Sequence, residues 1–477
     1  MFLRLQISDD NNPFYRGLTQ LNSAPPKATI RGWIRSKITG DYPSIIRIKW
    51  FITGLKARRD HIKAIGRALS VSVLNQVVSS GTNFGLGLYL VRTLTPAEFG
   101  LYGIGFAITL FYAGIGNALF LTQMVVHFPD KAQEDQLPYA ARIFTVLGLF
   151  CLLTALLAGL LLVLSGIWSG WLSQYVGLGL AILAASIAYL LKDFFVRHAY
   201  TTRREVWALG MNIAVAIALA AMLLVQHYSG SSFNSENALR IYAMTNMTGA
   251  VVGFFLSRLP LRSVRQRQVV EDAHEAWRGG RWAFGGASTT WVQSQAYTYV
   301  TALFLGPTGV GYANAARMLI TPFAMLVPAI DQVTMPRLAE LRAQDGEKMV
   351  KMGFFITSGL LALATIYSLI IIFAADHIVR FLLGNRFSNL RPLIIAWAIC
   401  LMFQLLRSNA GTILQVMKHF RILMLTNVIS AVATIVCTVL LIKKFGVPGA
   451  IIGTGMGDVF LALMLWRIVW NERHNIH

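Results

Sequence analysis

The chain has 477 residues, of which 55% are hydrophobic and only 13% are charged, and its formal net charge is +21. About a quarter of the residues in a soluble domain are charged, so this composition excludes an ordinary soluble protein and indicates an all-α polytopic membrane protein. The excess of Lys and Arg would also suit a nucleic-acid-binding protein, so its distribution along the chain must be considered.

The first 68 residues form a basic extension that precedes any apolar stretch of membrane-spanning length. Residues 1–43 contain four prolines, and we expect them to be loosely ordered. In residues 44–68, apolar side chains recur at helical spacing among Lys and Arg, which predicts a basic amphipathic helix lying on anionic inner-leaflet lipids. Binding to a protein partner is the alternative. The extension has no apolar run of signal-peptide length, so no cleavable signal is expected.

Twelve apolar stretches follow, each long enough for a membrane-spanning helix of roughly 20 residues. They divide into two runs of six, which we interpret as two six-helix bundles. The first bundle, residues 69–258, contains the predicted spans 69–91, 101–125, 142–165, 172–191, 207–227 and 238–257. After a basic cytoplasmic linker, 259–281, the second bundle, 282–470, contains the predicted spans 282–304, 311–335, 352–374, 391–413, 420–442 and 447–469, and 471–477 is a cytoplasmic tail.

Lys and Arg are distributed unequally over the loops that join these spans. When the termini and the even-numbered loops are assigned to one side of the membrane, that side has 33 Lys and Arg, the other side has 7, and 2 lie inside spans, which accounts for all 42. The positive-inside rule therefore predicts that both termini are cytoplasmic. Basic loops that face anionic headgroups explain the net charge, so no nucleic-acid partner is expected.

A short phrase recurs after the first span of each bundle. It reads LTPAEFG at 94–100 and LGPTGVG at 305–311, about 211 residues later. A phrase that returns at the same place in the order of helices indicates an internal repeat. Repeated bundles that meet at a seam are typical of carriers, so the sequence predicts a transporter.

These phrases also carry a resemblance to a known family. RTLTP at 92–96 with EFGLY at 98–102 resembles the first outer turn of polysaccharide-export, O-antigen-type flippases, which belong to the multidrug/oligosaccharidyl-lipid/polysaccharide transporter superfamily. Further stretches resemble the same family: LGP at 305–307, VGY at 310–312, AAR at 315–317, Pro322, Pro336, Gly384, Phe387, Leu390, Val447, Gly449 and Ala450. The basic extension departs from the family pattern, in which the first span begins near the start of the chain.

The resemblance implies a MATE-like fold, with a V-shaped pair of six-helix lobes, related by a pseudo-twofold axis, around a central cavity. It implies that an undecaprenyl-pyrophosphate-linked oligosaccharide is moved by alternating access from the inner to the outer leaflet of a bacterial inner membrane, for exopolysaccharide, capsule or O-antigen synthesis. A polysaccharide polymerase and chain-length machinery are the protein partners that it implies. We expect no cofactor, no metal and no enzymatic activity.

Two arginines lie within predicted spans, Arg317 in the eighth and Arg407 in the tenth. A cation at membrane depth is costly and usually faces protein or water, so both are candidates for binding the phosphates of a lipid-linked substrate. For Arg407, extension of the side chain to the nearby headgroups is the alternative.

Two acids are candidates for binding a coupling ion. Asp458 lies near the middle of the last span, where it could instead form a salt bridge to an arginine. Asp331 lies closer to the predicted inner face, which favours an interfacial position. The fourth inner loop, with Lys192, Asp193 and Arg197, is either a site of substrate access or, as we favour, a solvated basic loop.

The first helix of each bundle has a polar face. Gln76 and Asn83 recur at helical spacing with two serines in the first helix, and Gln293 and Tyr297 recur with a threonine in the seventh. Because the first helices line the cavity in the family, these four residues are candidates for contacting sugar. Hydrogen bonding between helices is an equally good interpretation for each one.

Three other functions remain as alternatives. A cation-coupled multidrug antiporter would share the fold, but its site should be rich in acids and aromatic residues. A peptidoglycan-precursor flippase typically has fourteen spans. A membrane polysaccharide polymerase or glycosyltransferase needs a sizeable outer loop or a paired acidic motif, and the longest outer loops here have about 10 to 16 residues.

Overall fold

The computed structural model describes residues 70–472 apart from 169, 231, 385, 388 and 418. The described part of the chain is helical, contains no strand, and lies within one compact unit, Ser70–His477. The predicted amphipathic helix 44–68, with the rest of the extension, and most of the tail 471–477 lie outside the described residues. The boundaries of the two predicted bundles and of the linker stay predictions.

The helices of the first half match the predicted spans with one clear exception. α8 (Val176–Thr201) continues ten residues past the predicted end at 191, so Lys192, Asp193 and Arg197 lie in a helix and Lys192 is buried. The prediction of a solvated basic loop at these residues was therefore wrong. The first described helix covers residues 70–93. It is followed by α4 (Pro96–Gly116), the π-helical turn η2 (Asn117–Leu121), α5 (Thr122–His127), η3 (Phe128–Asp130), α6 (Gln133–Trp168), α7 (Gly170–Ser173), α8 (Val176–Thr201), α9 (Glu205–Tyr228) and α10 (Ser235–Ser257).

The second half contains two long helices that are interrupted by glycines. Its elements are η4 (Leu261–Ser263), α11 (Gln266–Ala324), α12 (Leu326–Gln344), α13 (Gly346–Phe373), α14 (Ala375–Ile378), η5 (Val379–Leu383), α15 (Arg391–Val416) and α16 (Phe420–Glu472). In α11 and α16 the chain breaks at Gly306 (φ 70°) and Gly446 (φ 64°), where a positive φ favours glycine. Each therefore comprises two helices. In α11 the second of them ends at Ala324, so the predicted span 311–335 is divided between α11 and α12.

The chain is a multi-pass membrane protein. Within the described residues, eight helices are long and apolar enough to cross a membrane. α6 exposes seven leucines between residues 149 and 161, which would be a large apolar patch in water and is suited to contact with lipid tails. Twelve crossings and cytoplasmic termini remain predictions.

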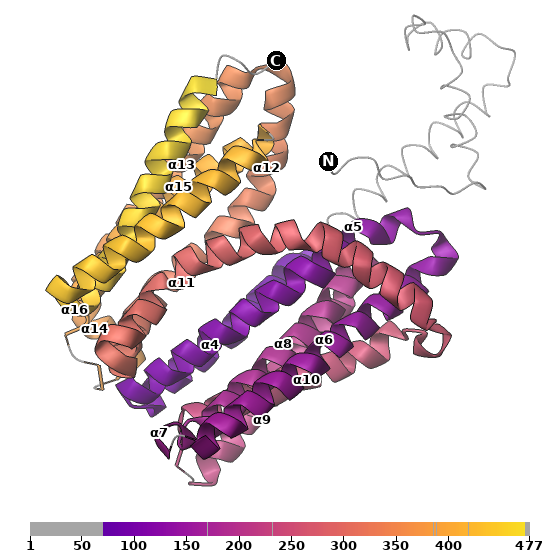
Figure 1. Cartoon of the computed structure of the whole chain (residues 1–477). Coiled ribbons are helices and arrows are strands. Elements are labelled where there is room, and N and C mark those ends of the chain that lie inside the picture. Colours follow the sequence, from indigo (N-terminus) through magenta and orange to yellow (C-terminus); the bar gives the residue numbers. More distant parts are fainter. Residues whose placement is uncertain are drawn as a thin grey trace, which may run out of the picture. The chain divides into compact units, whose positions relative to one another are not determined.

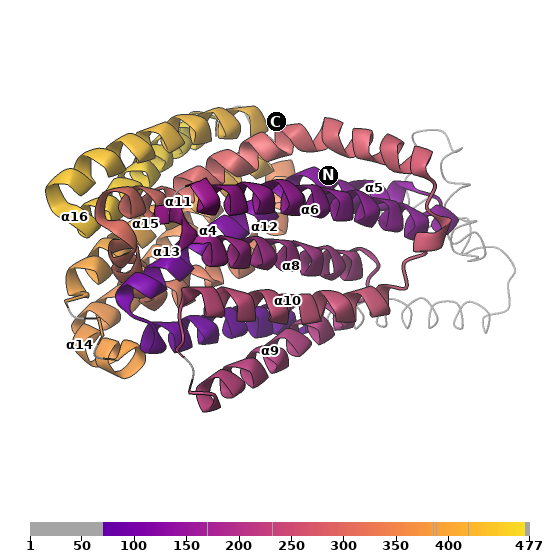
Figure 2. The same ribbon diagram turned by 60° about the horizontal axis from the view of Figure 1, so that its bottom comes forward.

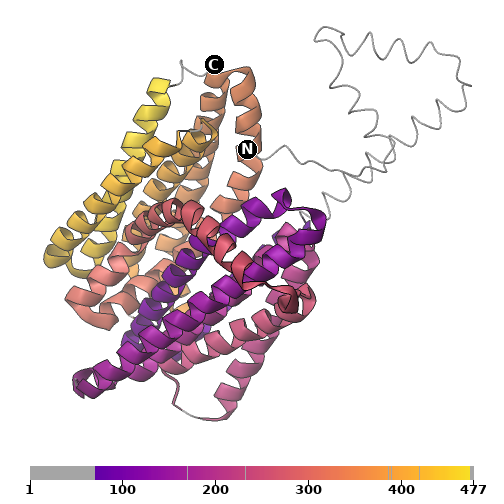
Figure 3. The ribbon, with the colours of Figure 1, turned by 45° about the vertical axis from the view of Figure 1, so that its right-hand side comes forward.

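The described helices form two groups with α11 between them. Figures 1 and 3 show the indigo-to-magenta helices α4 to α10 as one group and the orange and yellow helices α12 to α16 as the other. In Figure 2, α6, α8 and α10 of the first group run nearly parallel. α11 packs on α4 as well as on α15 and α16, so it belongs to the contact between the groups.

The recurring phrase begins a helix at both of its positions. Thr95 caps α4 by accepting a hydrogen bond from the backbone N–H of Glu98 at 3.3 Å, and Pro96 occupies the first turn. In the second copy, Gly306 breaks α11 and Pro307 starts its second half. Helix-breaking and helix-starting residues therefore explain why the phrase sits between two spans in both bundles.

The two copies of the phrase also pack against each other. A Cβ atom on Gly100 would lie 1.8 Å from the carbonyl oxygen of Pro307, and one on Gly311 would lie 2.0 Å from that of Pro96. The backbones of α4 and the second half of α11 thus touch where neither has a side chain. This reciprocal contact is what a pseudo-twofold repeat produces at its axis.

Two arginines reinforce the same end of the molecule. Arg92 Nε donates a hydrogen bond to the carbonyl oxygen of Leu382 at 2.8 Å, and its Nη2 donates to that of Phe381. Arg386 Nη1 in turn donates to the carbonyl oxygen of Thr93. Each arginine thereby satisfies carbonyls at a helix end on the other side of the contact, where a cation is favoured. We call this set of contacts the arginine clamp.

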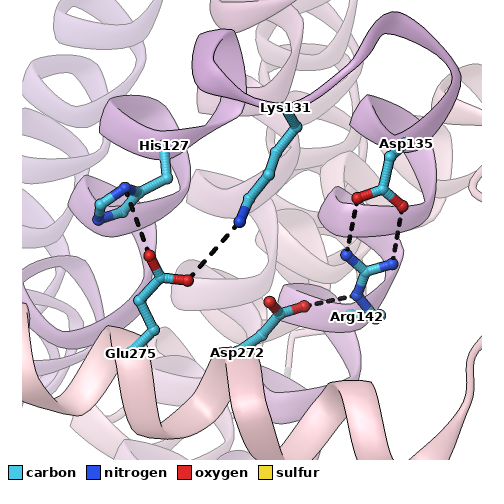
Figure 4. Close-up of polar contacts among 6 residues, drawn as sticks. All are labelled: His127, Lys131, Asp135, Arg142, Asp272 and Glu275. Atoms are coloured by element: carbon cyan, nitrogen blue, oxygen red, sulfur yellow. Dashed lines mark hydrogen bonds and ion pairs between the residues drawn. The ribbon is translucent and has the colours of Figure 1, made fainter.

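A second polar cluster, shown in Figure 4, fixes the start of α11 to the first group. Arg142 lies 3.1 Å from Asp135 and 2.5 Å from Asp272, and Glu275 pairs with Lys131 at 3.6 Å and with His127 at 3.7 Å. The predicted linker is helical from Gln266 onward and is continuous with the following span. The ion pairs hold this segment against the first group, and Gly279 and Gly280 allow it to approach α5 and η2 closely.

Candidate functional site

A cavity lined by both apolar and polar side chains lies where the two groups of helices meet. It has a volume of about 440 Å³ and is formed by the first helix, α4, α11 and α15. Three of the predicted site residues line it, namely Asn83, Tyr297 and Arg317. We call it the central cavity; Asn314, Trp397 and Gln404 are among its other polar or aromatic residues.

Arg317 is held in place by aromatic side chains. Its Nη1 donates a hydrogen bond to Tyr297 Oη at 2.8 Å, and that hydroxyl donates to Asn314 Oδ1 at 2.7 Å. The guanidinium carbon lies 5.4 Å from the ring centroid of Tyr297 and 5.2 Å from that of Trp397, in cation–π geometry. Trp397 is itself anchored, because its Nε1 donates to the carbonyl oxygen of Ala313 at 2.9 Å.

The cavity is suited to an anion. None of its lining residues is acidic, and among the described residues no carboxylate lies within ion-pairing distance of Arg317. The contact to Tyr297 uses one of the five N–H donors of the guanidinium, so others remain for a ligand. A planar, oriented guanidinium of this kind matches the paired oxygens of a phosphate or carboxylate.

The local sequence explains how Arg317 reaches this position. Ala313, Ala315 and Ala316 are completely buried and pack the second half of α11 closely against its neighbours. Arg317 follows them, ten residues after Pro307 and so almost three turns into the helix that this proline starts, on the face that lies against Tyr297 and Trp397. The small residues therefore allow this helix to pack closely against its neighbours, and Arg317 extends from it into the lining of the central cavity.

Three other predicted residues meet in a second cluster, which is outside the cavity lining but within electrostatic range of Arg317. Arg407 Nε lies 3.0 Å from Asp458 Oδ1, and Gln293 Nε2 donates to the same oxygen at 3.2 Å. Gln293 also donates to Ser430 Oγ at 2.9 Å. Asp458 is thus paired with an arginine of the chain, which was one of the two interpretations from the sequence. A coupling cation at Asp458 would have to compete with Arg407.

One predicted residue, Gln76, lies outside both sites. Gln76 is exposed, and its Nε2 donates to Ser80 Oγ on the same helix at 3.0 Å, outside the central cavity. The side chain of Asp331 lies outside the described residues. Sequence reasoning gave no role to Trp397, because a tryptophan within an apolar span has no polar periodicity that marks it. Among the described residues, no three His, Cys, Asp or Glu side chains gather in a way that could hold a metal ion.

This fold, with a cavity between two groups of apolar helices, is the fold of membrane transporters that include a flippase. The chain belongs to the polysaccharide biosynthesis protein family, whose family model matches residues 89–392. The resemblance noted from the sequence is therefore confirmed, as is the all-helical, MATE-like fold class. No curated protein sequence matches the chain.

Solved structures with the same fold come from two kinds of transporter. An inward-facing multidrug resistance MATE transporter of the MOP superfamily is 13% identical with a TM-score of 0.68, over 86% of this chain and 98% of that chain. The lipid II flippase MurJ in an inward closed conformation is also 13% identical with a TM-score of 0.68, over 84% of this chain and 87% of that chain. An outward-facing MATE transporter, 12% identical over 86% and 96%, has a lower TM-score of 0.58.

Proposed function

We propose that this protein moves a polyprenyl-pyrophosphate-linked oligosaccharide from the inner to the outer leaflet of the bacterial cytoplasmic membrane by alternating access. Its product would serve exopolysaccharide, capsule or O-antigen synthesis, and its protein partners would be a polysaccharide polymerase and chain-length machinery. The observation that carries the proposal is Arg317, an oriented cation in a cavity without acidic lining residues. The family supports a polysaccharide-related cargo.

The chemistry of such a cargo explains the cavity. A pyrophosphate is anionic and sugars are strongly hydrated, so both are costly to move through hydrocarbon. Arg317 would bind the phosphate oxygens, and Asn83 and Gln404 would offer amide donors and acceptors to the sugars. The polyprenyl tail would remain in lipid. Anionic inner-leaflet lipids are the further partner that we propose, through the basic residues of the predicted inner loops.

The conformation supports alternating access. Both inward structures superpose on this chain more closely than the outward-facing one. The end of the molecule that holds the arginine clamp is closed by backbone contact between Gly100 and Pro307. We infer that this is the outer end and that the structure is an inward-facing state.

A multidrug antiporter of the same fold is a weaker proposal. The fold alone admits it, and Tyr297 and Trp397 would suit an aromatic drug. A cationic drug would nevertheless have to approach Arg317, with no acidic residue in the cavity lining to balance it. Polymerase or glycosyltransferase activity is not proposed, because the family and the fold are those of transporters.

The test compares a producing strain with one that lacks this protein. We expect lost surface polysaccharide together with accumulated lipid-linked repeat units in the deletion strain, and restoration by the wild-type chain. Unchanged surface polysaccharide with raised sensitivity to cationic dyes would refute the proposal and favour the antiporter.

A further inference from the structure

A second cavity continues the central cavity along the same two helices. It has a volume of about 490 Å³ and lies between α4, α8 and α11. Leu110 of α4 lines both cavities. On α11, Ser294 lines the second cavity and the next residue, Gln295, lines the central one. Because α4 and α11 pack side by side, as Figure 1 shows, the two cavities lie end to end.

The second cavity has a different charge from the central one. Its lining includes Asp193 and Arg197, whose Oδ2 and Nε atoms lie 3.0 Å apart in an ion pair. This pair contributes no net charge, so it does not favour a pyrophosphate as Arg317 does. Both side chains are partly exposed, at 22% and 35%, so they still offer a carboxylate acceptor and guanidinium donors to a ligand.

Aromatic faces and small polar groups complete the lining. The rings of Phe111 and Trp291 lie with centroids 6.3 Å apart and planes 25° apart, one from α4 and one from α11. Asn117, Thr290 and Ser294 line the same cavity with an amide and two hydroxyls. The two hydroxyls donate to carbonyl oxygens of their own helix, so they offer acceptor lone pairs to a ligand. Aromatic faces pack against the apolar faces of pyranose rings, while the polar groups bind ring hydroxyls, so the set matches a saccharide.

We propose that the second cavity is the glycan subsite of the transporter. It takes uncharged, hydroxyl-rich sugar residues of the headgroup, while the pyrophosphate lies at Arg317. This inference rests on the proposed function and deepens it, because it separates the common part of the substrate from the part that differs between polysaccharides. It assigns the residues of the fourth predicted inner loop, Asp193 and Arg197, to substrate binding.

The experiment uses native mass spectrometry of the full-length protein in lipid nanodiscs. The two probes are undecaprenyl pyrophosphate, which has no sugar, and the lipid-linked saccharides extracted from the producing cells. The variants are Trp291→Ala and Asp193→Asn for the second cavity, and Arg317→Ala for the central one. Trp277→Ala is the matched control, because Trp277 lies on the same helix and is 55% exposed.

The expected results differ between the cavities. Wild-type protein and Trp277→Ala bind both probes and prefer the lipid-linked saccharide. Trp291→Ala and Asp193→Asn bind undecaprenyl pyrophosphate normally and lose about tenfold in affinity for the saccharide, the effect of one favourable contact set. Arg317→Ala weakens binding of both probes. Trp291→Phe, which keeps an aromatic face, restores most of the saccharide affinity.

The alternatives are separable. If the second-cavity variants weaken both probes equally, or neither, the glycan subsite is refuted while the proposed function stands. If the wild-type protein binds neither probe, both proposals fall. Melting temperatures of the purified variants show whether a loss of binding is a loss of folding.

Discussion

At the scale of single residues, the sequence predicts best which ionisable side chains within the spans lie in polar sites. Arg317, Arg407 and Asp458 stand out because ionisable residues are rare within spans, and all three lie in polar sites of the structure. Their partners could not be predicted. The pairing of Arg407 with Asp458 depends on the register between α15 and α16, which packing sets and local sequence does not.

Arg317→Ala should weaken binding of undecaprenyl pyrophosphate by about 10- to 100-fold, because a charge-assisted hydrogen bond to phosphate is lost. Arg317→Lys should recover only part of it, since Lys cannot place two N–H donors in one plane between the two rings. Isothermal titration calorimetry measures the effect. The control is Arg240→Ala, since Arg240 is an exposed arginine of α10. Unchanged affinity in both Arg317 variants would show that Arg317 does not bind the pyrophosphate.

Asp458→Asn should destabilise the protein by about 2 kcal/mol, because it leaves the partly buried Arg407 without its counter-charge. The double variant Asp458→Leu, Arg407→Met should regain most of that stability, since it removes both charges together. Thermal unfolding in detergent measures both. A stable Asp458→Asn protein whose transport no longer depends on an ion gradient would instead make Asp458 a coupling residue.

At the scale of elements, the spans were predictable and their junctions only partly. Long apolar runs predicted the helices, and the break in α11 at Gly306 falls between the predicted spans 282–304 and 311–335. The helical start of α11 at Gln266 was not expected as part of the seventh span, because residues 266–281 are too polar to read as membrane-spanning. Ion pairs to the first group, such as Arg142 with Asp272, hold that segment in place, and a sequence pattern does not show such pairs.

Gly100→Ala should lower the melting temperature by several degrees, because the added Cβ would lie 1.8 Å from the carbonyl oxygen of Pro307. The backbone cannot move aside cheaply, so α4 and α11 would separate. Gly148→Ala in α6 is the control, since a Cβ there meets nothing within 4 Å and alanine favours a helix. Differential scanning fluorimetry of both variants decides. Equal melting temperatures would mean that the contact between the repeated phrases is not tight.

At the scale of the whole molecule, the two copies of the repeated phrase hold the two groups of helices together at one end. The phrases at 94–100 and 305–311 meet at one end, where the arginine clamp joins the same two groups of helices. Elsewhere, the ion pairs around Asp272 and Glu275 fix the start of α11 to the first group. The proposed alternating access would require the clamp to open while that start of α11 stays with the first group.

Removing the clamp should therefore favour the opposite state. In an Arg92→Ala, Arg386→Ala protein, three hydrogen bonds from these side chains to carbonyls are lost, which at about 1 kcal/mol each raises the open population roughly 100-fold. The reporter is a cysteine at Leu94, which is 1% exposed in this state, in a protein whose native cysteines are replaced. Its labelling by a membrane-impermeant maleimide in whole cells should speed up by the same factor.

The control and the orientation are tested together. Arg380→Ala removes an exposed arginine from η5, the segment whose carbonyls accept hydrogen bonds from Arg92, and should leave the labelling rate unchanged. If the clamp variant labels no faster than Arg380→Ala, the clamp does not hold this end closed. If the cysteine reacts in inverted vesicles but not in whole cells, the clamp lies on the cytoplasmic side. The orientation predicted from 33 basic residues against 7 would then be reversed, and the state described here would be outward-facing.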